Sequence, residues 1–393
     1  MAHPQRQVNP KVIDAAAKEW IAAQQHTTSA VDALRLKYGL KEPYYSCIAQ
    51  IAAKIKYQKK FDGLPSGWVF PTGQALEQSS SVDTAKFKAS LLDTSYFVDL
   101  CAGMGIDTWA FEALSTTKIG LCFEVNAAVA RLLEHNLSKT KVRQSEAELD
   151  QIDDWMRLNS IESNALTIYL DPDRRAGGKR TFGIDEGTPN LLELQSELLQ
   201  RSRCVIAKHS PMLDLESSRD LLHLSEIVIV QLRGECKEIL TIQERSYQGQ
   251  TTIKVIELDT NEVLEFQEKF ADVPVSADWD QFLIQPAAAL SKSGAHHRLA
   301  AAQNWKATAF GNLYTSAVAP KASSHYRVYE VIEECAPYKF KTTLTKAAIE
   351  CIGFPETVDA VRKRLKVKEG STQKVFALRS GRKKSMILCQ RVS

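Results

Sequence analysis

The sequence predicts a doubly wound α/β fold, in which a mostly parallel sheet is covered by helices on both of its faces. Between residues 95 and about 210, short apolar runs alternate with stretches whose apolar residues recur at steps of three and four. Apolar strands that alternate with helices are typical of a parallel sheet buried on both faces. A helical region precedes this alternation, and two small modules that mix helix and strand follow it.

The composition is that of a globular protein and argues against several classes. The 393 residues are enough for two or three domains, and 44% of them are hydrophobic and 25% charged. No apolar run approaches the roughly 18 residues of a membrane helix, and the N-terminus lacks the apolar core of a secretory signal. The eight cysteines form no CxxC pair, and the eight histidines lack metal-ligand spacing. We therefore expect a cytoplasmic protein with no metal site and no membrane association, and its oligomeric state stays open.

Residues 1–90 are predicted to form a helical N-terminal region. Apolar residues recur at helical spacing in VIDAAAKEWIAAQ and in YYSCIAQIAAKIKYQKKF. The proline- and glycine-rich stretch over residues 62–73 indicates a domain boundary. A helix resumes after it, capped by Ser81 or a neighbouring serine.

Residues 91–272 are predicted to form the doubly wound domain. Strands are expected at residues 96–100, 118–124, 141–145, 166–171 and 204–209, with helices between them. Two β-rich segments within residues 226–243 meet at Arg233-Gly234 and predict a hairpin, and residues 251–258 add a strand. An antiparallel hairpin thus follows the parallel series.

Two small α+β modules are predicted after this domain, at residues 273–322 and 323–393. The first contains a strand, a helix and a strand, and the second has a helix near 356–365 and strands near 374–378 and 384–391. Residues 321–393 carry 16 Lys and Arg against 7 Asp and Glu, a net charge of +9, whereas the remainder of the chain has a net charge of −6. Such an asymmetry is one footprint of nucleic-acid binding, and a solvated lysine-rich surface is the alternative.

The stretch VDLCAGMG is the first candidate for ligand binding. Asp99 ends an apolar strand, and Gly103 and Gly105 follow at a spacing that lets backbone amides approach a ligand and a helix begin tightly. A dinucleotide motif would need a third glycine where Thr108 stands, which argues against NAD. An acidic residue at the start of the loop suits S-adenosylmethionine, because its carboxylate can hold the methionine end. An ordinary strand-to-helix turn is the alternative.

Acidic and polar residues also follow the second and third expected strands. Glu124 stands 19 residues after Gly105, where a carboxylate can accept hydrogen bonds from both ribose hydroxyls. Ser145 and Glu146 would contact the adenine, and solvent-facing polar residues are the alternative at these positions. The candidate cofactor-binding residues are Asp99, Cys101, Ala102, Gly103, Gly105, Asp107, Thr108, Glu124, Val125, Asn126, Ser145 and Glu146.

The stretch YLDPDRR is the candidate acceptor site. Asp171 and Pro172 end the fourth expected strand, where a carboxylate can hold an exocyclic amine beside the transferred group. Arg174 and Arg175 can stack on a base or pair with a phosphate. An aromatic partner for the base would come from elsewhere: Tyr169, Phe182 or Tyr314. A helix-entry turn with two surface arginines is the alternative.

These residues resemble the class I S-adenosylmethionine-dependent methyltransferases, and more narrowly a bacterial group with a C-terminal THUMP-like domain. The similarity covers most of the chain. ALEQSSSVDTAKFKASLL resembles the segment before the first strand, and VDLCAGMGIDT and DPDRRAGGKRTF resemble the cofactor and substrate motifs. GNLYTS resembles a small ferredoxin-like insert, and VRKRLKVKEG resembles the start of the THUMP-like end.

The resemblance implies a Rossmann-like class I sheet that ends in an antiparallel hairpin, S-adenosylmethionine as cofactor, and an RNA partner, since THUMP domains bind tRNA. The cofactor motif and FEVNAAVARLLEHNL also resemble guanine methyltransferases of RNA caps and of tRNA. Those enzymes carry an aromatic residue or a second proline after the aspartate-proline pair, where this chain has Asp173 and Arg174.

The leading hypothesis is a cytoplasmic methyltransferase that modifies a base nitrogen in tRNA or rRNA, with RNA held by the basic C-terminal domain. The candidate catalytic residues are Asp171, Pro172, Arg174 and Arg175. Methylation at a pyrimidine C5 is disfavoured, because it needs a cysteine nucleophile where the chain has Lys208 to Pro211. A small-molecule methyltransferase and a non-catalytic RNA-binding protein that retains the fold are the alternatives.

Overall fold

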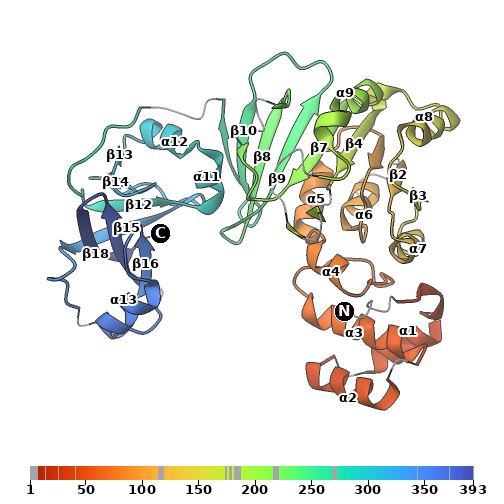
Figure 1. Ribbon diagram of the computed structural model, residues 1–393, viewed down its shortest axis with the longest axis horizontal. Coiled ribbons are helices and arrows are strands. Elements are labelled where there is room, and N and C mark those ends of the chain that lie inside the picture. The colour runs from red at the N-terminus through yellow and green to blue at the C-terminus, as the bar shows by residue number, and fades with distance from the viewer. Residues whose placement is uncertain are drawn as a thin grey trace. The chain divides into compact units, whose positions relative to one another are not determined.

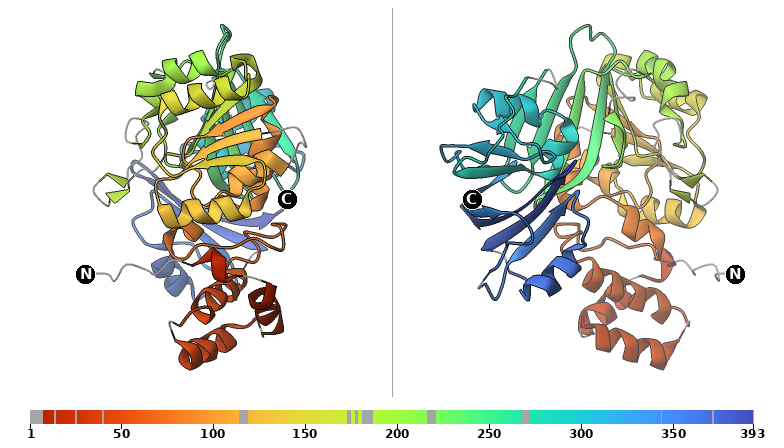
Figure 2. Two further views of the ribbon diagram at one scale, coloured as in Figure 1. Left: turned by 90° about the vertical axis from the view of Figure 1, so that its right-hand side faces the viewer. Right: turned by 60° about the vertical axis from the view of Figure 1, so that its left-hand side comes forward.

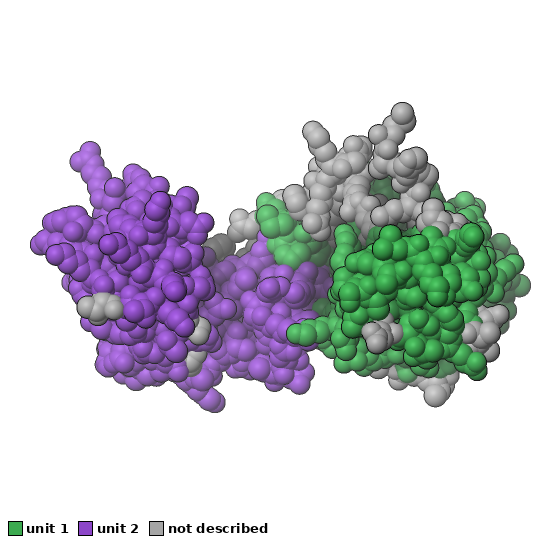
Figure 3. All heavy atoms as spheres, turned by 90° about the horizontal axis from the view of Figure 1, so that it is seen from below, with its two compact units in different colours: residues 1–225, 240–249 green, residues 226–239, 250–393 purple. Residues whose placement is uncertain are grey.

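The computed structural model describes residues 8–13, 15–24, 26–39, 41–113, 119–172, 175–176, 179–180, 187–215, 221–267, 272–342, 344–370 and 372–392. The chain divides into two compact units (Figure 3). The first comprises residues 1–225 and 240–249, and the second comprises residues 226–239 and 250–393.

Helices make up the N-terminal part of the first unit, as the sequence predicted (Figure 1). They are η1 (Pro10–Val12), α1 (Ala15–Ala23), α2 (Thr28–Tyr38), α3 (Tyr44–Lys56), α4 (Gln74–Gln78) and α5 (Val82–Ser90). Ile21 of α1 and Ile48 and Ile51 of α3 lie in one buried core. Ser81 caps α5, because its Oγ accepts a hydrogen bond from the amide of Thr84 at 3.2 Å. The expected serine cap is therefore confirmed.

The segment between α3 and α4 is held by two side-chain amides. Gln50 donates a hydrogen bond to the carbonyl oxygen of Phe70 at 3.0 Å and accepts one from its N–H at 2.8 Å. Asn136 makes the same pair of bonds with Val69, at 2.9 Å in both directions. Both backbone polar groups of each residue are thus satisfied away from any sheet. This pairing fixes residues 69 and 70 between α3 and the helix that ends at Asn136.

A parallel sheet forms the body of the first unit. Its elements are β1 (Tyr96–Asp99), α6 (Ile106–Ala113), β2 (Ile119–Phe123), α7 (Ala127–Asn136), β3 (Thr140–Arg143), α8 (Leu149–Leu158), η2 (Ser163–Ala165), β4 (Leu166–Leu170), β5 (Arg175–Ala176), β6 (Lys179–Arg180), α9 (Leu191–Arg201) and β7 (Cys204–His209). The strand order is β7-β4-β1-β2-β3, and the neighbouring strands are parallel. Phe97, Ile168 and Val205 are buried, and helices lie on both sides of the sheet (Figure 2). The predicted doubly wound arrangement is confirmed.

The hairpin predicted at Arg233-Gly234 is also confirmed. These two residues join β8 (Glu226–Leu232) to β9 (Glu235–Glu244), and their φ angles are +57° and +75°. Positive φ at both central positions is typical of the type I′ turn, whose twist matches that of the strands it joins. Glu257 accepts hydrogen bonds from the amides of both turn residues, at 3.1 and 3.2 Å.

Two more strands extend the sheet beyond this hairpin. β10 (Thr252–Glu257), expected from the sequence, runs parallel to β8, and β11 (Glu262–Phe266) pairs antiparallel with β10. The strand order of the larger sheet is β11-β10-β8-β9-β7-β4-β1-β2-β3. The hairpin thus follows the parallel series, as the class I resemblance implied.

A mixed sheet forms the rest of the second unit. Its elements are β12 (Phe282–Pro286), α11 (Ala288–Ser293), α12 (His296–Ala302), β13 (Lys306–Ala307), β14 (Tyr314–Ser316), β15 (Tyr326–Cys335), β16 (Ala348–Ile352), α13 (Val358–Leu365), β17 (Gln373–Ser380) and β18 (Lys383–Arg391). The order is β13-β14-β12-β15-β18-β17-β16. Leu283 and Phe310 share a buried core with Phe376, so the two predicted modules continue each other. The exact domain boundaries stay predictions.

Among the described residues, no helix is both long enough and apolar enough to cross a membrane.

Candidate functional site

The loop after β1 is tied together by the carboxylate of Asp99. The amide of Cys101 donates to its Oδ1 at 3.1 Å, and the hydroxyl of Thr108, in the first turn of α6, donates to its Oδ2 at 2.6 Å. Asp99 is only 1% exposed, and burial raises its pKa to about 7, although the Thr108 hydrogen bond opposes this shift. Asp99 therefore links the two ends of the glycine-containing loop.

Glycine is required at the two positions of this loop for different structural reasons. Both have positive φ, +54° at Gly103 and +82° at Gly105, a region that side chains rarely adopt. A Cβ at Gly105 would lie 2.3 Å from Cδ2 of Leu133, so this glycine allows α6 and α7 to pack closely. A Cβ at Gly103 would meet nothing within 4 Å. Gly103 therefore leaves open space beside the loop, as a ligand would require.

The residues after β2 and β3 line the same edge of the sheet. Oε1 of Glu124 accepts a hydrogen bond from the amide of Asn126 at 2.7 Å, and Asn126 caps the N-terminus of α7. Val125 is 63% exposed. After β3, the hydroxyl of Ser145 donates to the carbonyl oxygen of Glu146 at 2.8 Å. Parallel neighbours end at one edge, so these residues and the β1 loop lie along it.

A buried ion pair that the sequence analysis missed lies beside this loop. Nζ of Lys88, whose side chain is fully buried, is 2.9 Å from Oδ1 of Asp107. Ser80 and Tyr169 donate hydrogen bonds to Oδ2 of Asp107, at 2.8 and 2.9 Å. Burial disfavours the charge on Asp107, but Lys88 and then Lys208 outweigh it, so the pKa of Asp107 lies below its usual value.

These contacts give Asp107 a structural task, and its cofactor contact stays a prediction. The signal for the network was present in the sequence. Lys88 stands on the face of α5 that also carries Ala85 and Ala89, which are buried. A lysine on such a face needs a buried partner.

A second ion pair lies where β4 ends. Asp171 follows directly on β4, and its Oδ2 is 2.5 Å from Nζ of Lys208, which lies on the neighbouring strand β7. Their side chains are 31% and 14% exposed, so the pair is only partly buried. Pro172 is buried, and a Cβ at Gly187 would lie 2.7 Å from its Cβ. In the sequence, Lys208 was notable only because it begins the stretch where a cysteine nucleophile would be needed.

The structure describes only part of the predicted acceptor site. Arg174 and Phe182 lie outside the described residues, and Arg175 begins β5, although its side chain is not described. The expectation that Tyr169 or Tyr314 stacks on a base is wrong, because both are only 1% exposed. The hydroxyl of Tyr169 is engaged by Asp107 and that of Tyr314 lies 2.6 Å from Nδ1 of His296.

Comparisons with known proteins agree with this fold. Residues 326–391 match the family model described as THUMP domain-like. A crystal structure of a candidate methyltransferase from Porphyromonas gingivalis W83 matches 98% of this chain and 99% of its own, with 24% sequence identity and a TM-score of 0.79. No curated protein matches the sequence.

Other solved methyltransferases are less similar. The N-terminal domain of human METTL16 in complex with SAH covers 59% of this chain and 95% of its own, with 12% identity and a TM-score of 0.34. A candidate RNA methyltransferase from Pyrococcus horikoshii, PH1948, covers 50% and 96%, with 15% identity and a TM-score of 0.29. These similarities are too low to transfer a function from either protein.

The fold is that of a methyltransferase, with a THUMP-like module at its C-terminal end. Over nearly its entire length, the chain has the architecture of the Porphyromonas gingivalis protein. The resemblance found in the sequence is therefore confirmed at the level of the fold.

The buried ion pair can be tested by unfolding. Lys88→Met should lower the free energy of unfolding by about 3–5 kcal/mol, because it leaves the carboxylate of Asp107 buried without its partner. The double variant Lys88→Met/Asp107→Asn removes both charges and should recover much of that loss. Chemical denaturation measures all three proteins. A double variant no more stable than Lys88→Met would contradict this account of the pair.

Proposed function

We propose that this protein is an S-adenosylmethionine-dependent methyltransferase that methylates a base nitrogen in tRNA or rRNA. One observation carries the proposal: the open loop after β1 and the Asp171–Lys208 pair after β4 stand at the carboxyl ends of neighbouring parallel strands. Ligands of open parallel α/β sheets bind at this edge. A cofactor held by the loop would thus meet an acceptor held at the pair.

The residues around the loop fit a cofactor with a cationic methionine end. The space beside Gly103 can receive it, and Glu124 can accept hydrogen bonds from ribose hydroxyls. An ammonium group near Asp99 would favour the ionised form of a carboxyl whose pKa burial raises to about 7. When bound, S-adenosylmethionine supplies an electrophilic methyl group on a sulfonium.

Asp171 is the residue that we expect to hold the acceptor. Its carboxylate can accept an N–H hydrogen bond from a base amine and so orient the lone pair of that nitrogen. Lys208 fixes the direction of the carboxylate through the 2.5 Å contact. The new N–C bond forms as the S–C bond breaks, and the nitrogen then loses its proton to the carboxylate or to water. Positioning supplies most of the rate of such an in-line displacement.

An RNA partner is supported by the THUMP domain-like match and by the net charge of +9 over residues 321–393. Arg362 and Arg364 are less available for contacts with RNA phosphates, because they are already paired with acidic side chains of the same region. Within residues 362–368, the other basic residues are exposed and have no ion-pair partner among the described residues: Lys363, Lys366 and Lys368. These lysines are candidates for phosphate contacts.

Gly103→Arg should abolish binding of S-adenosylmethionine, because a long side chain would fill the open space beside the loop. Gly381→Arg is the matched control, since Gly381 also has positive φ, +57°, with nothing within 4 Å, but lies in the turn between β17 and β18. Isothermal titration calorimetry of both variants decides the assignment. Equal affinity in the Gly103 variant and the wild type would remove the loop as the cofactor site.

Asp171→Ala should keep cofactor binding and lose roughly a hundredfold in turnover, the usual loss for one polar contact at a reacting centre. Lys208→Met should reduce turnover in the same direction, because the carboxylate of Asp171 loses its fixed orientation. Methyl transfer to RNA from a strain that lacks the gene measures both. Turnover within a few-fold of wild type in Asp171→Ala would make Asp171 a structural residue.

Replacing Lys363, Lys366 and Lys368 with Gln should weaken RNA binding and flatten its salt dependence. Each lost phosphate contact lowers the slope of log affinity against log salt by roughly 0.7 for single strands, so the expected change is up to about 2. Replacing Arg362 and Arg364 with Gln should change the slope little, because acidic partners already neutralise them. Gel-shift titrations at several salt concentrations provide the slopes.

The whole chain is needed for this test, since β15 to β18 share one sheet with β12 and β14. Equal slopes for the lysine variant and the wild type would leave the basic segment as a solvated surface.

A further inference from the structure

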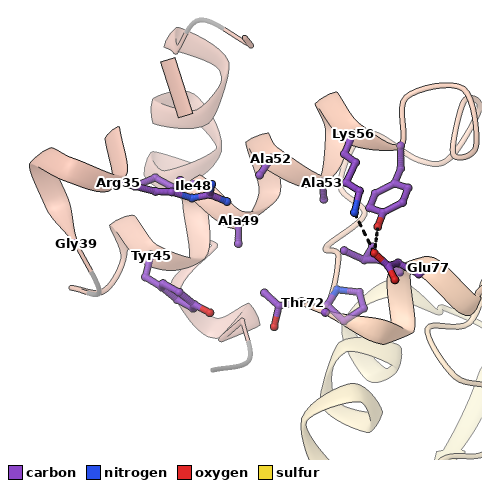
Figure 4. A pocket seen from close by; sticks show the side chains of 14 residues that line it. Arg35, Gly39, Tyr45, Ile48, Ala49, Ala52, Ala53, Lys56, Thr72 and Glu77 are labelled. Atoms are coloured by element: carbon purple, nitrogen blue, oxygen red, sulfur yellow. Dashed lines mark hydrogen bonds and ion pairs between the residues drawn. The ribbon is translucent and has the colours of Figure 1, made fainter. Parts of the chain in front are cut away.

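A groove of about 530 Å³ lies in the N-terminal helical region, away from the loop and the ion pairs described above. One wall is α3, and the other is the segment of residues 71–77 (Figure 4). Ala49, Ala52 and Ala53 line the α3 side, and their small side chains leave the space open. The volume is within the range of about 300–1,000 Å³ that is typical of ligand sites.

The groove is formed by fixed backbone. The hydrogen bonds of Gln50 to Phe70 and of Asn136 to Val69 hold the segment that leads directly into the second wall. A ligand would therefore meet a prepared surface, which reduces the entropy that binding must overcome.

The chemistry at the ends of the groove is basic and aromatic. Arg35 and Tyr45 border one end and Lys56 borders the other (Figure 4). Tyr57, which follows Lys56 in the chain, also lines the groove. Glu77 pairs with Lys56 at 3.0 Å and Asp32 pairs with Arg35 at 3.4 Å, but all four side chains are at least 59% exposed, so water and salt weaken both pairs. Residues 35–60 contain seven Lys and Arg and one acidic residue. The surroundings therefore attract an anion.

Positive charge combined with aromatic side chains is the arrangement that binds single-stranded nucleic acid, since the cations meet phosphates and the rings stack on bases. An unpaired base can enter a groove of this size without the cost of unpairing and unstacking that a base inside a duplex must meet. We propose that this groove binds an unpaired nucleotide segment of the RNA substrate. The inference rests on the proposed function, and adds to it a second RNA contact that recognises a base rather than charge alone.

Ala52→Trp provides the test, because it fills the groove without changing any charge. With a fluorescein-labelled oligouridylate and the full chain, fluorescence anisotropy should show affinity weakened by about tenfold, the scale of one lost stacking contact. Ala22→Trp is the matched control: Ala22 is exposed on α1 and does not line the groove, so its affinity should equal that of the wild type.

A second variant covers the case in which Ala52→Trp does not fold, as judged by its thermal melting. Arg35→Glu reverses the charge at one end of the groove, where the side chain is 59% exposed, and should weaken binding as well. In addition, oligouridylate that carries 4-thiouridine should cross-link to a peptide within residues 35–77 of the wild type.

Unchanged affinity in both groove variants, together with cross-links only outside residues 35–77, would overturn the groove proposal and leave the methyltransferase proposal intact. Loss of self-association in Ala52→Trp without loss of RNA affinity would also overturn it, because the groove would then be an interface between copies. If the wild-type chain transfers methyl groups but binds no single-stranded RNA, only the groove proposal is excluded. A chain that neither transfers methyl groups nor binds RNA excludes both proposals.

Discussion

The buried pair of Lys88 and Asp107 is the interaction on which the candidate site depends. It joins α5, which precedes the sheet, to the first turn of α6, and through Tyr169 it also holds β4. The glycine-containing loop ends at α6, and Asp171 stands two residues after Tyr169. One carboxylate therefore sets the position of both halves of the site. A buried ion pair is a poor source of net stability, so its value here is the geometry that it imposes.

Charges of alternating sign continue from this pair to the surface. Lys208 contacts Asp171 at 2.5 Å and also contributes to lowering the pKa of Asp107. Among the described residues Asp99 has no ion-pair partner, and burial raises its pKa to about 7. Lys88 and Lys208 thus contact the carboxylates near β4, whereas the carboxyl group of Asp99 in the loop is available to a cationic ligand. This difference suits the proposed cationic cofactor beside Asp99 and the proposed amine acceptor beside Asp171.

Local patterns in the sequence predicted most of the fold. The parallel strands were recognisable because their apolar runs are buried on both faces, the hairpin because Arg233-Gly234 suits a two-residue turn, and the cap of α5 because Ser81 precedes it. Contacts between distant residues were not recognisable. Nothing in the spacing pairs Lys88 with Asp107 or Asp171 with Lys208, and strand periodicity could not reveal that the ring of Tyr169 is enclosed by its own protein. The groove beside α3 could not be predicted for a related reason, since alanines that line a cavity have the same spacing in the sequence as alanines in a core.

The net charge counted from the sequence has the same limit, because the sequence does not show which charged side chains pair with each other. The net charge of +9 over residues 321–393 treats every cation alike, whereas the structure pairs Arg362 and Arg364 with neighbouring acids.

The proposed methylation of an RNA base can be tested by mass spectrometry of nucleosides from each RNA class, compared between a strain that lacks the gene and its parent. The account predicts that one methylated base disappears from tRNA or rRNA in the strain without the gene and returns when the gene is restored. Identical nucleoside profiles in all RNA classes would contradict it.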